Sequence, residues 1–145
     1  MNNLKDIQEY QRAVKYGFEP LLDWRKFTLP IRLRVELQRQ LFGHCTLTKA
    51  DNIARANERF YRWVFEHKTQ VCEETGKPLY DYSAIHVSHI LTKGSHPEMS
   101  HDPRNTNLLT AEAHELWENG DRKGMKIYPL NLIIIELLKS DYSNL

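Results

Sequence analysis

The stretch that decides the fold is "HVSHILTKGSHPEMSHDPRNTNLLTAEAH", which runs from His86 to His114. It holds five of the chain's seven histidines around an Asp-Pro-Arg-Asn segment. Its beginning is typical of a strand, and its glycine and prolines indicate a loop of about 18 residues, a length that is usually functional in a compact domain. Thr110 is a good N-cap for the helix that "AEAHELWEN" predicts, and Gly120 ends that helix. The order is therefore strand, long loop and helix.

A β-hairpin is predicted immediately before this loop. The segment "VCEETGKPLYDYSAIHVSHI" has a Thr-Gly-Lys-Pro turn between short β-rich pieces. We expect strands near residues 70–72, 79–81 and 85–90.

Helices are predicted on both sides of these elements. Apolar residues recur at helical spacing over 3–16, 30–43, 48–68 and 128–142. Pro30 and Thr48 begin two of these helices, and Pro129 lies in the first turn of the last. In the second helix we expect the apolar side chains to face inward (Ile31, Val35, Leu41) and the arginines to face outward (Arg32, Arg34, Arg39).

The composition is that of an ordinary globular chain. It has 145 residues, of which 41% are hydrophobic and 27% charged. No apolar run approaches the roughly 20 residues that cross a bilayer, so we expect no membrane association and a cytoplasmic protein. Two cysteines are too few for a disulfide framework or a four-cysteine zinc site.

Charge is distributed unevenly along the chain. Residues 1–71 carry 13 Lys/Arg and 8 Asp/Glu, whereas residues 72–145 carry 7 and 11. Arg55, Arg59 and Arg62 form a basic stripe on the predicted helix over 48–68. The stripe either lies along a DNA backbone or is simply solvated.

His89, Asn105 and His114 follow one another on the predicted strand, loop and helix. This order resembles the ββα-metal finger of the HNH (His-Me finger) endonucleases, and the wording "HILTKGSH…DPRN" is similar to phage recombination nucleases of the NinG type. The resemblance covers about residues 70–120. It implies an α+β, mostly helical fold, in which a basic helical region over 1–69 precedes an HNH region over 70–145 with a closing C-terminal helix.

The resemblance also implies a function. The chain would be a metal-dependent DNA endonuclease with His89 as general base and His114 as metal ligand, and RNA stays open as a substrate. Asn105 would pin the loop and help to orient the base. The cation would be Mg²⁺ or Mn²⁺, with Zn²⁺ and Ni²⁺ as further candidates. The second hypothesis is a catalytically degenerate HNH fold that acts as a DNA-binding module.

The sequence does not decide which other residues would bind the cation. Glu118 follows His114 by four residues, so it shares a helix face with it and is either a second ligand or an exposed residue. Most HNH nucleases carry Asp or His immediately before the general base, where this chain has Ser88. His86 either supplies the missing ligand or supports the hairpin.

Other polar residues near the loop have two interpretations each. We expect Arg104 to neutralise the scissile phosphate and Lys93 to contact a phosphate. His96 and His101 are either polar surface or further phosphate contacts, and Asp102 is a turn-former before Pro103.

Many relatives hold the hairpin with a Cys-x-x-Cys zinc site, but here Thr75 stands where a second cysteine would follow Cys72. We therefore expect no structural zinc and expect packing by Trp117, Tyr80 and the last helix instead.

Overall fold

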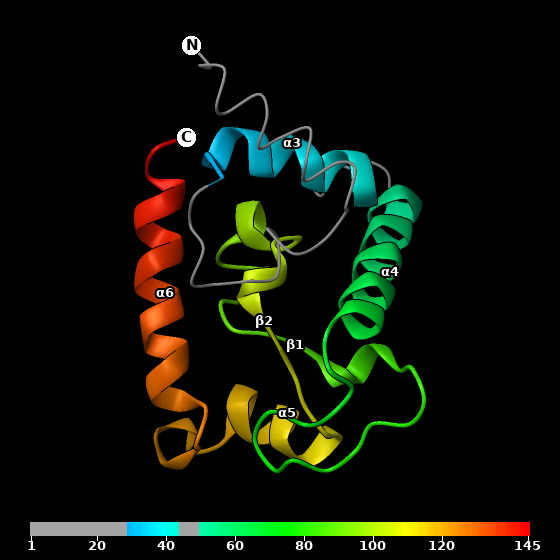
Figure 1. Ribbon diagram of the computed structural model, residues 1–145, viewed down its shortest axis with the longest axis vertical. Coiled ribbons are helices and arrows are strands. Elements are labelled where there is room, and N and C mark those ends of the chain that lie inside the picture. The colour runs from blue at the N-terminus through cyan, green and yellow to red at the C-terminus, as the bar shows by residue number, and fades with distance from the viewer. Residues whose placement is uncertain (1–28, 44–49) are drawn as a thin grey trace.

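Helices surround a small two-stranded sheet in the computed structural model, which describes residues 29–43 and 50–145 (Figure 1). The four helices are α3 (Ile31–Phe42), α4 (Ala50–His67), α5 (Ala111–Asn119) and α6 (Tyr128–Tyr142), and the strands are β1 (Val87–His89) and β2 (Thr106–Leu108). Four 3₁₀ turns connect them: η1 (Ala84–His86), η2 (Pro97–Met99), η3 (Pro103–Asn105) and η4 (Arg122–Gly124). The expected α+β, mostly helical class is confirmed. The predicted helix over 3–16 and the cap at Thr48 lie outside the described residues.

The sheet differs from the predicted hairpin. β1 pairs antiparallel with β2, with Val87 opposite Leu108 and His89 opposite Thr106. The segments near 70–72 and 79–81 meet only at an isolated bridge between Val71 and Pro78, so the prediction of two strands there is wrong. Pro78 has no N–H group with which to extend a ladder. The partner of β1 lies beyond the long loop, in a segment for which the sequence predicts no strand.

The helix boundaries follow from local chemistry. The Thr110 hydroxyl accepts a hydrogen bond from the Ala113 N–H, and the Gly120 N–H donates to the Leu116 carbonyl, so both predicted ends of α5 are confirmed. A Cβ at Gly120 would lie 3.0 Å from the Leu116 carbonyl oxygen and 3.1 Å from Leu116 Cα, so a larger residue would crowd the backbone of the last turn. Pro129 lies in the first turn of α6, also as predicted.

The sheet lies between α4 and α6 (Figure 1). On one side a buried cluster includes Phe60, Val87 and Leu108, and on the other a second cluster includes Trp117 and Leu138. The apolar side chains of this second cluster come mostly from the loop, α5 and α6, so burial of their surface holds the closing helix against the loop and α5. None of the described helices is long and apolar enough to span a bilayer.

Two packing predictions are wrong. Tyr80 is 85% exposed, whereas Trp117 is buried as expected. Arg34, which was predicted to face solvent, is fully buried. Ile31 is buried, Val35 and Leu41 are partly buried, and Arg32 and Arg39 are exposed, as the periodicity of α3 predicted.

Candidate active site

His89 is the last residue of β1, and its ring is buried. Its Nε2 lies 2.8 Å from the carbonyl oxygen of Ser100. A carbonyl oxygen only accepts hydrogen bonds, so Nε2 carries the proton, and in the neutral ring Nδ1 holds the lone pair. The ring stacks on Phe60 at a centroid distance of 5.9 Å and meets the edge of Tyr61 at the same distance. His89 is thus held in one tautomer with Nδ1 as the proton-accepting atom.

The surroundings of His89 keep its ring neutral. Burial lowers the pKa of His89 to about 4, and the hydrogen bond to the Ser100 carbonyl opposes that shift. The charges of Lys93 and His114 lower the pKa further, whereas that of Glu118 raises it. These side chains therefore lie close enough to His89 to act on it electrostatically.

His114 and Glu118 lie on one face of α5, as their spacing predicted. His114 Nε2 is 2.9 Å from Glu118 Oε1, and His114 Nδ1 contacts the carbonyl oxygen of Ile85. Both ring nitrogens of His114 therefore face acceptor oxygens. A cation in place of a proton between Nε2 and the carboxylate would be bound by both side chains. The Glu118 side chain is 48% exposed, so solvent reaches this pair.

His86 and Ser88 do not extend this pair. His86 Nδ1 lies 3.0 Å from the Leu109 carbonyl, so the ring ties η1 to the residue that follows β2. This contact is consistent with the supporting role, and the role as a ligand stays a prediction. Ser88 is buried, and its hydroxyl has no hydrogen-bond partner among the described residues.

The donors present suit only a partly hydrated cation. Residues 29–43 and 50–145 contain no group of three or more His, Cys, Asp or Glu that could hold a metal ion. His114 and Glu118 offer one imidazole nitrogen and one carboxylate. Mg²⁺ is commonly bound through one or two carboxylates with several waters and substrate phosphates, so Glu118 suits it, whereas the imidazole of His114 suits Zn²⁺ or Ni²⁺.

Asn105 pins the loop that follows β1. Its buried side-chain amide donates to the Leu91 and Met99 carbonyls at 3.0 and 3.3 Å, and its Oδ1 accepts from the Leu91 N–H at 2.8 Å. Met99 precedes Ser100, whose carbonyl binds His89, so Asn105 acts on the His89 ring through the loop. The expected pinning is confirmed.

Arg104 does not face the site, and its predicted contact with a phosphate is wrong. Its side chain is 0% exposed and donates to Asp102 at 2.6 Å and to Asp141 at 2.9 Å. Tyr142 donates to the same Asp102 carboxylate at 3.0 Å. A buried arginine needs such partners, because an unpaired buried charge is very costly. Asp102 also accepts from the Arg104 N–H, so it is the turn-former that the sequence predicted, with an ion pair in addition.

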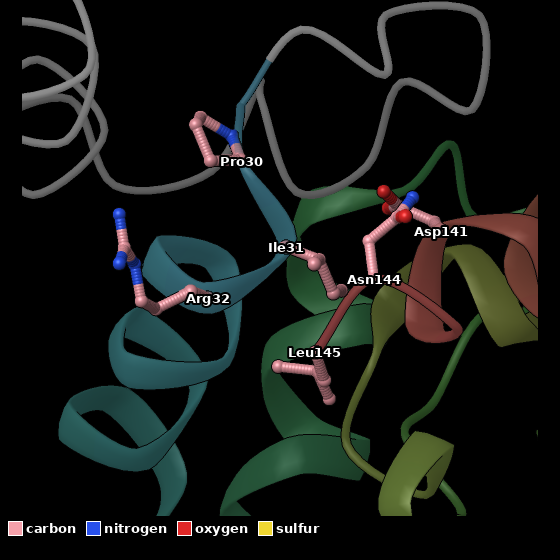
Figure 2. Close-up of a pocket in the computed structure, with 6 residues that line it drawn as sticks. All are labelled: Pro30, Ile31, Arg32, Asp141, Asn144 and Leu145. Atoms are coloured by element: carbon pink, nitrogen blue, oxygen red, sulfur yellow. The ribbon is translucent and has the colours of Figure 1, made fainter. Parts of the chain in front are cut away.

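Asp141 connects this ion-pair network to the surface. It lines a cavity of about 500 Å³ between the start of α3 and the end of α6, together with Ile31 and Asn144 (Figure 2). Its side chain is 16% exposed, against 0% for Asp102. Asp102 is therefore the carboxylate that depends most on Arg104.

The remaining predicted cations are at the surface. Lys93 is exposed, and its Nζ donates to the Tyr61 hydroxyl at 2.6 Å. Arg55, Arg59 and Arg62 are exposed along α4. Arg62 pairs with Glu58 at 2.8 Å, and Arg59 donates to the Phe42 carbonyl, so part of the stripe is engaged within the protein. Its contact with DNA stays a prediction.

His101 was expected at the surface or on a phosphate, but it is buried behind His89. Its Nε2 is 2.8 Å from Asn57 Oδ1, and its ring lies 5.2 Å from that of Phe60. Burial, followed by the charge of His89, lowers the pKa of His101 to about 4. His96 is half-buried beside Ser95.

Sequence reasoning missed Tyr61, Asn57 and Ser100. The one available signal was that Tyr61 and Asn57 are four residues apart and thus share a face of α4. Nothing in the sequence relates that face to His89.

Comparison of the chain with family models, with curated proteins and with solved structures gives no match. A functional assignment therefore depends on the residues of the site itself.

Proposed function

We propose that the protein is a metal-dependent DNA endonuclease in which His89 is the general base. The observation that supports this most is that a neutral imidazole, His89, lies near an imidazole–carboxylate pair, His114 and Glu118. A neutral imidazole has its Nδ1 lone pair unused by the Ser100 contact, and an imidazole–carboxylate pair on α5 lies within its electrostatic reach. A phosphodiester hydrolase needs a proton acceptor and a cation site close together.

The proposed reaction begins when His89 Nδ1 takes a proton from a water molecule that attacks the phosphate. An incoming phosphate is an anion, so it opposes the effect of Lys93 and raises the pKa of His89 toward the range in which a base is most effective. A divalent cation held by His114 and Glu118 would supply Lewis-acid stabilisation of the phosphate and the leaving 3′ oxygen. Asn105 and Ser100 keep the imidazole in the reactive tautomer throughout.

Plasmid nicking across Mg²⁺, Mn²⁺, Zn²⁺ and Ni²⁺ tests this proposal. His89→Ala should lower nicking by about 10²–10⁴-fold while DNA affinity stays near that of the wild type. His114→Ala should weaken cation binding in isothermal titration. His67→Gln, on the far end of α4, serves as the histidine control and should nick normally. If the wild-type protein cuts no plasmid with any of these metals, the proposal is wrong.

The second candidate is a DNA-binding module without nuclease activity. It is favoured by the burial of Ser88 and by the small number of donors beside His114. This candidate predicts salt-dependent DNA binding that His89→Ala and His114→Ala leave unchanged, with no cleavage.

A further inference from the structure

A second cavity lies between α4 and the loop that follows β1. Its volume is about 320 Å³, and its lining residues are Ile53, Asn57, Lys93, Gly94, Pro97 and Ser100. We call it the loop cavity. Its volume is at the lower end of the range for small-ligand pockets.

The loop cavity shares a wall with the candidate active site. Ser100 lines the cavity, and its carbonyl oxygen binds His89 Nε2 at 2.8 Å. Lys93 also lines it, and Lys93 Nζ contacts the hydroxyl of Tyr61, whose ring meets that of His89. A group that occupies the cavity would therefore be a close neighbour of a phosphate at His89.

The lining has the chemistry of a nucleotide site. Among the described residues the lining holds no carboxylate, and the one charged residue there, Lys93, is exposed and cationic. Ile53 from α4 and Pro97 from the loop offer apolar surface for the face of a ring. Asn57 Oδ1 is bound by His101, so its amide N–H groups are left to donate to the edge of a base. The Ser100 hydroxyl donates to the Pro97 carbonyl and can still accept.

We infer that the loop cavity receives one unpaired nucleobase next to the scissile phosphate, with Lys93 on the adjoining phosphate. This inference depends on the proposed endonuclease function and narrows its substrate class to DNA that has an unpaired nucleotide at the cut. A base inside a duplex must first be unstacked at a cost of a few kcal/mol. In a bulge, flap or single strand the base is already unpaired, so little of that energy is needed. Distorted DNA should therefore be bound and cut in preference to a regular duplex.

Gly94 lines the cavity and offers a variant that alters its wall. A Cβ at Gly94 meets no atom within 4 Å, and its backbone is not in the left-handed region, so Gly94→Phe adds a ring at this wall without strain in the loop. Gly124 in η4 is equally open and lies outside both the loop and α4, so Gly124→Phe is the matched control.

The experiment measures affinity for three DNA duplexes, one regular, one with a single bulged nucleotide, and one with an abasic residue in the bulge. Fluorescence anisotropy is recorded with EDTA present, so that no DNA is cut. The wild-type protein and Gly124→Phe should prefer the bulged base over the abasic bulge by about tenfold, and Gly94→Phe should lose that preference. A general loss of stability would weaken binding to all three duplexes and leave the ratio unchanged.

The outcomes separate the inference from the proposed function. Equal binding of the bulged base and the abasic bulge by the wild-type protein, or an unchanged ratio in Gly94→Phe, overturns the inference even if plasmid is nicked. A ratio that depends on Gly94 in a protein that never nicks DNA supports the nucleobase site and rejects the nuclease.

Discussion

Replacement of Arg104 by leucine tests the strongest departure from the sequence-based expectation. The guanidinium is fully buried and binds the Asp102 and Asp141 carboxylates. Burial alone would raise the pKa of Asp102, but the charge and hydrogen bonds of Arg104 overcome that effect and lower it. Without Arg104, two carboxylates lose their main partner. Removal of one partner of a buried ion pair costs about 3–5 kcal/mol.

The expected decrease in the free energy of unfolding is near the lower end of that range. The buried Arg34 also acts electrostatically on both carboxylates, and Asp141 is partly exposed, so some compensation survives. We expect Arg104→Leu to lower the free energy of unfolding by about 3 kcal/mol and the melting temperature by roughly 10 °C. Urea unfolding followed by circular dichroism measures the first quantity. The double variant Arg104→Leu/Asp102→Asn should be more stable than Arg104→Leu, since it removes the carboxylate left without its partner.

The phosphate-contact interpretation predicts a different result. If Arg104→Leu unfolds at the same urea concentration as the wild type but binds DNA more weakly, the arginine faces the substrate and the ion-pair reasoning is refuted. If both variants stay folded at low temperature and bind DNA with wild-type affinity, the internal role is supported.

Two further predictions concern the buried polar groups of the loop. The pKa values of His89 and His101 are about 4 in the folded protein and near 6.5 when unfolded, so the unfolded chain binds more protons as the pH falls from 6.5 to 4. The free energy of unfolding should decrease by up to about 3 kcal/mol per histidine over that window, and resonances assigned to His89 or His101 that titrate near 6.5 in the folded protein would contradict this. Asn105→Ala removes three hydrogen bonds and leaves the Leu91 N–H without its acceptor, so we expect a loss of about 2–3 kcal/mol in urea unfolding. Its nicking should fall while cation binding at α5, measured by titration calorimetry, stays intact, and normal nicking would exclude a positioning role.

The helices could be predicted from the sequence because their signals are local. The helical periodicity, the Thr110 cap, Gly120 and Pro129 lie within a few residues of the structure that they determine. The placement of His114 with Glu118 follows in the same way from their spacing of one turn.

The missed features depend on long-range contacts. β2 is only three residues long, "TNL", which is too short to show an alternating pattern, and it pairs with β1 across the loop. Nothing in the sequence around Arg104 distinguishes it from a surface arginine. Its partner Asp141 comes from α6, 37 residues later. His101 is likewise buried only because α4 places Phe60 and Asn57 against the loop.

The connection between Arg104 and Asp141 has a consequence for biosynthesis. The two residues are 37 positions apart, and Tyr142 follows Asp102 by 40. During translation the ribosome releases the histidine-bearing loop, with the Arg104–Asp102 pair, well before the helix that supplies the second carboxylate of the network. A nascent chain that ends before α6 lacks Asp141 and Tyr142, so we expect the loop to become fully ordered only when that helix has emerged and docked.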